Sequence, residues 1–210
     1  MHIHWKIERL DEGEDPNPAD GESLIEIEGK IECDGQPAGL VDAYYLFAED
    51  PESPAAFMDF WDLDSRTCRL FEEIIAPGRR EFREPIREFL GVAPGILCVN
   101  FTALRPPFRR RRLGREVMGE VVRNFADERV GMVLLNAQPL QHLPHGYDHF
   151  DDEVRDLPWN SPEEDLARLV SHFYTWGMTH LPGTRYLLAA PENLSKDLAT
   201  DWYPGLLWGE

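Results

Sequence analysis

A short basic segment, set between an apolar run and an amphipathic helix, constrains the fold of this chain most strongly. The apolar run covers residues 96–104, the letters PPFRRRRLGR follow from Pro106, and the helical pattern continues to Val122. Six arginines stand within residues 105–115, although the formal net charge of the chain is -18. A strand, a basic turn containing glycine and a helix N-terminus favour negative charge through free N–H groups and the helix dipole. The segment therefore predicts a bound polyanion.

Length and composition predict one globular domain over residues 1–210. The chain is 42% apolar, which is enough to build a core without disulfides or metals. Its three cysteines, Cys33, Cys68 and Cys98, are far apart and lack C-x-x-C spacing, so they favour neither a disulfide framework nor a thiolate zinc site. The N-terminus lacks a signal-peptide core, and no apolar run approaches the ~20 residues of a membrane span. We expect a cytoplasmic protein without a membrane partner.

The acidity of the chain limits its partners. Asp and Glu number 39 against 21 for Lys and Arg, and the acids are spread along the sequence. Free nucleic acid is therefore not an expected ligand. Two explanations of the charge remain open: it keeps the protein soluble, or it attracts a cationic substrate.

The periodicity of apolar residues predicts an α/β fold of the α+β kind. Alternation predicts three antiparallel strands at the start of the chain, and a change of period predicts two or three short helices within residues 53–91. A central strand over residues 96–104, a helix from Leu113 and a buried strand over 131–135 follow. Ser161, Pro162 and Glu164 predict the start of a further helix. The remaining expected segments are the initial strands 3–9, 24–32 and 40–47, a strand over 184–189 and a tail from 193 that closes a sheet edge or a dimer contact.

Four motifs along the second half of the chain resemble those of one enzyme superfamily. The letters RRRRLG at residues 109–114 are similar to the signature Q/R-x-x-G-x-G/A, and LRPPF at 104–108 to its apolar-x-Pro-x-aromatic lead-in. GMVLLNAQPLQ at 131–141 resembles a strand and exit loop of a less characterised bacterial branch. FYTWGM at 173–178 resembles a Tyr-x-x-x-Gly-Phe element. On these motifs the chain resembles the GNAT superfamily of N-acetyltransferases.

The resemblance implies a mixed, mainly antiparallel sheet flanked by helices, with acetyl-CoA between the strands at Ile96 and Gly131. It implies direct transfer of an acetyl group from acetyl-CoA, as cosubstrate, to a primary amine of a small molecule or peptide. Backbone N–H groups at the basic turn would hold the pyrophosphate, and one on the preceding strand would hold the thioester oxygen. Gly114 would allow close approach of the main chain and positive φ. The implied binding residues are Ala103, Leu104, Arg105, Arg109, Arg110, Arg112, Leu113, Gly114 and Arg115.

The chain departs from the family pattern at three residues and in one connection. Arg112 stands where glycine is usual, and Ala167 where a helical asparagine is usual. The position of the family's tyrosine acid holds Phe173, and Tyr174 follows one residue later, about 100° around the helix. Tyr174 is the candidate general acid. Two helices that usually follow the first strand, and help to form the acceptor pocket, are expected here between the third and fourth strands. Acceptor residues therefore do not follow from the family pattern, and Trp61, Asp62 and Asp64 are only hypotheses.

A histidine-rich loop holds the candidate general base. His142, His145 and His149 can titrate near neutral pH, and His145 is the candidate. A Pro-Gly loop offers no helical face to align metal ligands, so we expect no metal; a place in the acceptor pocket and ordinary loop packing both remain open. Two interpretations of Cys98 remain open. A buried, unreactive thiol is the commoner case, and a covalent nucleophile is the alternative.

Two other classes of function remain open. A non-catalytic module that binds CoA or a protein fits the departures at Arg112, Ala167 and Phe173. A mimic of nucleic acid that occupies a basic partner fits the net charge of -18, and the arginine cluster opposes it. A homodimer is also possible.

Overall fold

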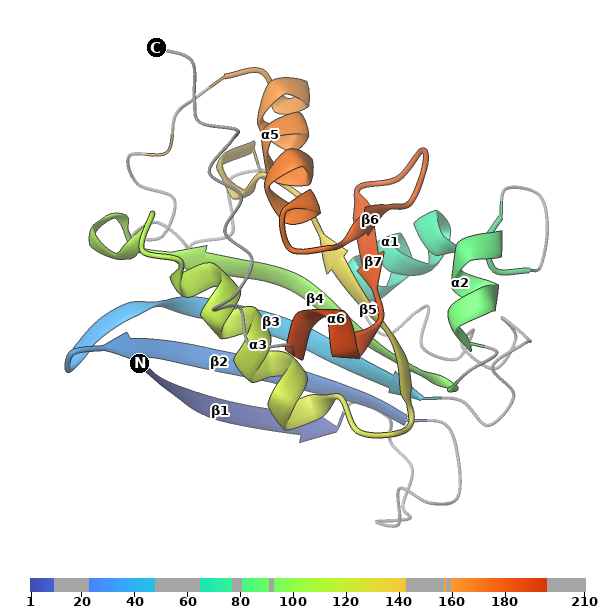
Figure 1. Cartoon of the computed structure of the whole chain (residues 1–210), viewed down its shortest axis with the longest axis horizontal. Helices are drawn as coiled ribbons and strands as arrows, with labels where there is room; N and C mark the ends of the chain where they lie inside the picture. The colour runs from blue at the N-terminus through green and yellow to red at the C-terminus, as the bar shows by residue number, and fades with distance from the viewer. Residues whose placement is uncertain are drawn as a thin grey trace.

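The chain folds around one mixed sheet. The computed structural model describes residues 1–9, 23–47, 65–76, 81–90, 93–142, 157 and 160–195. Within them, seven strands pair in the order β1-β2-β3-β4-β5-β7-β6 (Figure 1). Neighbouring strands run antiparallel except β4 and β5, which run parallel. The predicted α+β class, with a mainly antiparallel sheet, is confirmed.

The strands follow the predicted pattern closely. A tight turn at Asp34 and Gly35, both with positive φ, lets β3 begin earlier than expected. Thr184 donates its N–H to the carbonyl of Leu181 and so belongs to a turn, which shortens β7. The two-residue β6 was not predicted, because it is too short to show alternation. The bounds are β1 His2–Arg9, β2 Ser23–Cys33, β3 Gln36–Phe47, β4 Gly95–Leu104, β5 Val130–Asn136, β6 Thr179–His180 and β7 Tyr186–Ala189.

Five α-helices and two short 3-10 helices occur among the described residues. The helix α5 begins where the sequence predicts: Ser161 Oγ accepts the N–H of Glu164, and the Glu164 carboxylate accepts the N–H of Ser161. In the described part of the chain, no helix has the length and apolar character needed to cross a membrane. The helix bounds are α1 Ser65–Ile74, α2 Glu84–Leu90, η2 Pro106–Phe108, α3 Leu113–Phe125, η3 Leu140–His142, α5 Pro162–Tyr174 and α6 Pro191–Ser195.

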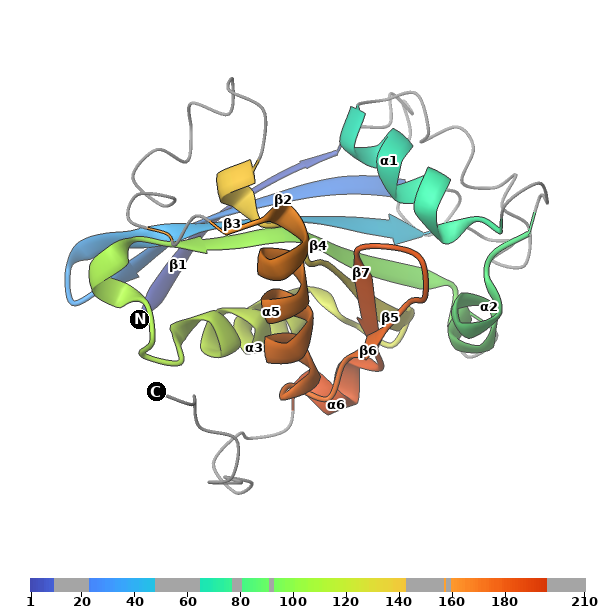
Figure 2. The ribbon, with the colours of Figure 1, turned by 90° about the horizontal axis from the view of Figure 1, so that it is seen from above.

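Apolar side chains bury both faces of the sheet. On β4, Leu97 and Val99 belong to the core cluster under α3 and α6, whereas Ile96 and Cys98 belong to the cluster under α1 and α2. This alternation places α1 and α3 on opposite sides of the sheet (Figure 2). The predicted helical insertion between the third and fourth strands is therefore confirmed as α1 and α2.

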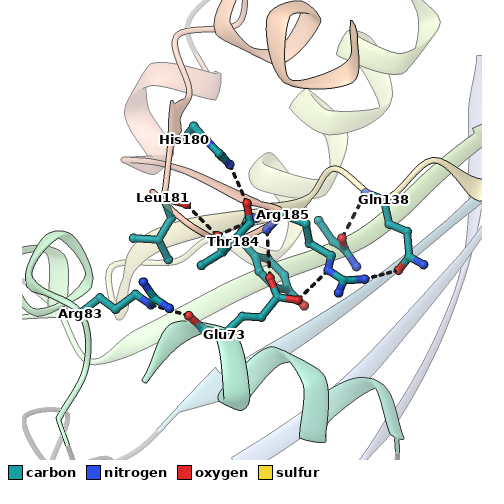
Figure 3. Close-up of polar contacts among 9 residues, drawn as sticks. Glu73, Arg83, Gln138, His180, Leu181, Thr184 and Arg185 are labelled. Atoms are coloured by element: carbon teal, nitrogen blue, oxygen red, sulfur yellow. Dashed lines mark hydrogen bonds and ion pairs between the residues drawn. The ribbon is translucent and has the colours of Figure 1, made fainter. Parts of the chain in front are cut away.

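A polar network joins this insertion to the end of the sheet (Figure 3). The Glu73 carboxylate accepts the backbone N–H of Arg185 at 2.9 Å and its Nε at 2.6 Å. Arg185 Nη1 also donates to Gln138 Oε1 at 3.1 Å, just after β5. Arg83 donates to the carbonyls of Glu73 and Pro182. The network fixes α1 and the β6–β7 turn to the chain that leaves β5.

Candidate functional site

The parallel strands β4 and β5 separate halfway along β4. Their register runs from Gly95 opposite Val130 to Val99 opposite Leu135. Beyond Val99, β4 continues to Leu104 paired with β3, while β5 ends at Asn136 paired with β7. In the described sheet, residues 100–104 of β4 therefore have one edge without a neighbouring strand. We call this stretch the free edge.

A β-bulge lies where the two strands separate. The register between β3 and β4 steps from Asp42 opposite Phe101 to Ala43 opposite Val99, so Asn100 is an extra residue. Asn100 Nδ2 donates to Asp42 Oδ2 at 2.9 Å, and both side chains are buried. Burial, and then the charge of Asp42, raise the pKa of the Cys98 thiol. Cys98 thus stays a protonated thiol, which does not favour its use as a nucleophile.

The N–H groups of the free edge alternate in direction. The N–H of Arg105 donates to the carbonyl of Ala38 on β3 at 2.9 Å and is not available to a ligand. Residues of an antiparallel pair alternate, so we infer that Ala103 also faces β3, whereas Leu104 faces away from it. The resemblance implies that Ala103, Leu104 or Arg105 donates an N–H to the thioester oxygen. Of these three residues, Leu104 alone directs its N–H to the free edge.

Thr102 is a donor on the free edge that the sequence did not reveal. By the same alternation its N–H points to the same side as that of Leu104. Its Oγ1 is buried and has no hydrogen-bond partner among the described residues. A buried polar atom without a partner is costly, so this position suits a ligand with a polar group. The direction of the Thr102 N–H follows from the register of β4 against β3. The sequence of one strand does not reveal that register.

The basic turn after β4 has two residues in the left-handed region. Arg109 Nε donates to the carbonyl of Leu104 at 2.9 Å and ties the turn to the strand end. Arg110 has φ 59° and Arg112 has φ 63°. Such residues turn successive N–H groups to one side, as in anion-binding nests. Among the described residues, the N–H groups of 110–114 have no acceptor, and no side chain caps α3. Such an arrangement of N–H groups is able to hold an anion.

The sequence analysis allows positive φ at Gly114, but the structure has it at Arg112. Gly114 stands in the first turn of α3, and a Cβ there would lie 3.6 Å from the Trp176 ring, an ordinary contact. Arg112 is the N-cap residue, in the left-handed region that glycine adopts most readily. Arginine thus has a backbone conformation that favours glycine, at a position where the resembled motif has glycine.

The conformation of Arg112 makes its replacement by glycine informative. The left-handed region costs an L-residue about 1–2 kcal/mol, and glycine loses about 0.5–1 kcal/mol in chain entropy, so the two terms partly cancel. We expect Arg112→Gly to be about 0.5–1 kcal/mol more stable than Arg112→Ala, since only alanine keeps the strain. Urea denaturation of the two variants measures this difference. Equal stabilities would show that the residue does not have positive φ in solution.

Four arginines at the basic turn form no ion pair with any other described residue. Arg110, Arg111 and Arg112 are exposed. Within the described ranges these three and Arg115 form no ion pair, and Arg111 lies over the Phe108 ring at 5.5 Å. Burial, and then Arg112, lower the pKa of Arg115. The alternative that these arginines balance neighbouring acids gains no support from the described contacts.

The C-terminal end of α5 packs toward the start of α3. Phe173 packs on the core, with its ring 4.9 Å from that of Trp176, which lies next to Gly114. The pKa of His172 is lowered by burial and by Arg115. Tyr174 is 51% exposed, so the two aromatic residues occupy different sides of the helix as the 100° rotation implies. The role of Tyr174 as general acid stays a prediction.

A buried carboxylate at the start of α5 was not singled out from the sequence. Asp165 accepts from Asn160 Nδ2 at 2.7 Å and Gln141 Nε2 at 3.0 Å, and its Oδ2 lies 2.9 Å from His142 Nε2. These hydrogen bonds, from Asn160 first and then His142, lower the pKa of Asp165 to about 2. In sequence Asp165 is one of three acids in a first turn, a common placement opposite the helix dipole. His145 and the rest of its loop, with Trp61, Asp62 and Asp64, lie outside the described residues.

Comparison with known proteins adds little to this geometry. No protein-family model matches the chain, and no curated protein matches it. The solved structure of a protein called SsHAT matches this chain with a TM-score of 0.34. The two sequences are 16% identical, and the match covers 78% of this chain and 72% of the SsHAT chain. A likeness of this strength carries no argument about activity.

Proposed function

We propose that the protein is an acetyl-CoA-dependent N-acetyltransferase of the GNAT type, which moves an acetyl group directly to a primary amine of a small molecule or peptide. One observation carries the proposal: the free edge of β4 leads directly into a turn whose N–H groups at residues 110–114 have no acceptor among the described residues. Acetyl-CoA is a long thioester with phosphates at one end. It needs an unpaired strand edge for its acyl arm, followed by an anion site for its phosphates.

The residues present fit the phosphate end of acetyl-CoA. Successive N–H groups at 110–114 and the start of α3 favour a pyrophosphate. Exposed Arg110 and Arg112 supply charge-assisted hydrogen bonds to phosphate oxygens.

The free edge fits the acyl end. The pantetheine arm contains amides that exchange hydrogen bonds with an unpaired strand edge, as an added strand does. The N–H groups of Thr102 and Leu104 point to that edge and would hold the thioester oxygen as negative charge develops on it.

The reaction requires two proton movements. A primary amine has a reference pKa near ~10.4 and attacks only after losing a proton, so a base is needed. The amine nitrogen then bonds to the carbonyl carbon, and the C–S bond breaks to release a thiolate with a reference pKa near ~8.5. Tyr174 remains the proposed acid and His145 a candidate base. The net charge of -18 favours a cationic amine.

One observation favours a second candidate, a non-catalytic module that binds CoA. The residue at the usual position of the acid is Phe173, packed on the core, and Tyr174 is 51% exposed at the end of α5. A site built this way binds the carrier without a proton donor at the sulfur.

Binding and turnover with acetyl-CoA separate these candidates. At 100 times its Kd, acetyl-CoA should stabilise the protein by about 2.7 kcal/mol, seen as a raised melting temperature. Pantetheine, which lacks the phosphates, should give a smaller shift at equal concentration. Release of free thiol in the presence of spermidine, a lysine peptide or a free N-terminal peptide then reports transfer. A shift without turnover favours the module, and no shift with acetyl-CoA or CoA contradicts both candidates.

A further inference from the structure

We propose that β1 pairs with β1 of a second copy of this chain, so that two sheets join into one across a two-fold axis. The proposal does not rest on the proposed acetyl transfer, because β2 and β3 separate β1 from the free edge of β4. The interface is the outer edge of β1 together with the two faces of that strand.

The strand β1 is a long edge of the sheet. In the described sheet it pairs with β2 alone and lies along one margin of the molecule (Figure 1). It has eight residues and no proline, and its pairing with β2 runs from His2 to Arg9 without a bulge. The strand at the opposite edge, β6, has only two residues. Short strands, prolines and bulges are what usually keep an edge from pairing with another chain, and β1 has none of them.

One face of β1 is apolar and only partly covered within the chain. Ile3 and Trp5 pack against the core cluster under α3, and the Trp5 ring lies edge-on to Phe125 at 4.9 Å. By alternation Ile7 lies on the same face, and it is 57% exposed. Met1, directly before the strand, is also exposed. The apolar face therefore continues to the open edge, where a second copy would cover it.

A two-fold axis at Trp5 gives a self-complementary register. In an antiparallel pair, residues directly opposite each other point to the same face of the sheet. With Trp5 opposite Trp5 of the second copy, Ile3 lies opposite Ile7, and the symmetry repeats this apolar pair. All of residues 1–9 then have an opposite residue. A slip of one residue would bring the polar face of one copy beside the apolar face of the other, so the apolar pattern favours this register.

The charges on the polar face of β1 also fit this register. Glu8 lies opposite His2 of the second copy, and Lys6 lies opposite His4. Within its own chain Lys6 Nζ lies 2.8 Å from the Glu8 carboxylate, and His4 Nε2 lies 3.5 Å from that of Glu32. Lys6 and His4 thus meet with a carboxylate already beside each. Shifting one copy by two residues would instead place Lys6 opposite Lys6 or His4 opposite His4.

The backbone of the outer edge completes the interface. In an antiparallel arrangement every second residue of β1 directs its N–H and C=O away from β2. In the proposed register an odd-numbered residue always lies opposite an odd-numbered one, so groups directed outwards meet groups directed outwards. These groups exchange hydrogen bonds between the two copies, as when a strand is added to a sheet edge.

Sedimentation velocity measures whether the protein is a dimer and whether β1 forms it. One strand pair is a small interface, so we expect a dissociation constant on the order of 1 µM and a dimer at about 100 µM. Ile7→Lys should raise that constant at least about 100-fold, because the two-fold axis buries the added charge twice without a partner. Tyr174→Lys is the matched control: Tyr174 is 51% exposed at the end of α5, and this variant should be as dimeric as wild type. Melting temperatures show whether both variants are folded.

Cysteine cross-linking tests the register. Ile3→Cys/Ile7→Cys should form a disulfide-linked dimer on mild oxidation, because each substituted position lies directly opposite the other in the second copy. Within one chain the two positions are about 13 Å apart along the strand, too far for a disulfide. Ile3→Cys alone and Ile7→Cys alone should cross-link no more than wild type, which reports the background from the native Cys33, Cys68 and Cys98.

Three results would overturn the proposal. A wild-type monomer at about 100 µM would show that another part of the chain or a different partner covers the edge of β1. A dimer that persists in Ile7→Lys would show that the copies meet elsewhere. Cross-linking of either single variant to the extent of the double variant would show that β1 does not pair about Trp5. Loss of the dimer in Ile7→Lys, with cross-linking in the double variant alone, supports it.

Discussion

Gly39→Ala should lower the free energy of unfolding by about 3 kcal/mol, at the upper end of the usual effect of overpacking. Gly39 lies opposite Leu104 in the pair of β3 and β4, and a Cβ there would clash with the carbonyl oxygen of Ala103. That oxygen belongs to the backbone, so the contact is relieved only if one strand moves. Ala103 belongs to the free edge, so moving this strand displaces the free edge. Gly39→Ala should therefore weaken acetyl-CoA binding as well as lower stability.

Gly119→Ala is the matched control for this prediction. Gly119 lies inside α3, and a Cβ there would meet the flexible end of Arg123 at 3.6 Å. Alanine is the better helix former, so this variant should gain about 0.5–1 kcal/mol. Urea denaturation gives both values. A Gly39→Ala protein within about 0.5 kcal/mol of wild type, the range of neutral surface changes, would show that β3 and β4 are not this close.

The double variant Arg110→Glu/Arg112→Glu should lose acetyl-CoA affinity by about 1000-fold, or about 4 kcal/mol. Each arginine contributes a charge-assisted hydrogen bond of about 1.5–3 kcal/mol, and glutamate adds repulsion of the phosphates. Both side chains are exposed, and among the described residues neither forms an ion pair, so the fold should stay intact. Calorimetric titration with acetyl-CoA measures the affinity.

Arg87→Glu/Arg123→Glu controls for the change in net charge. These two arginines are also exposed and lie on α2 and at the end of α3. Their reversal changes the net charge by the same amount, away from the turn. The control should bind within a few-fold of wild type at 0.15 M salt, where charges more than about 8 Å apart are largely screened. Equal losses in both double variants would mean that the arginines act through net charge and not as a site.

The sequence predicts the fold well where the signal is local. The capping box at Ser161 fixes the start of α5, and alternation fixes the strands of the antiparallel half. The separation of β4 from β5 was not predictable from either strand, because it depends on where β5 leaves β4 to pair with β7. Long-range pairing of this kind has no local pattern.

The candidate site, too, is predictable only where its residues are close together in sequence. The basic turn is contiguous, so the sequence identifies it, although the positive φ values lie at Arg110 and Arg112 and not at its glycine, Gly114. His142 and Asp165 are 23 residues apart and meet only in the folded chain, and each has an ordinary local role in sequence. The direction of the Thr102 and Leu104 N–H groups depends on β3, a strand more than 50 residues earlier.

Amide NMR of the protein titrated with CoA tests most directly whether main-chain N–H groups hold the carrier. The N–H resonances of residues 110–114 should shift on saturation, and those of Thr102 and Leu104 should shift with them, while that of Arg105, bonded to Ala38, should move little. If CoA leaves the resonances of 110–114 in place, or shifts only residues away from β4 and α3, the proposed site is wrong.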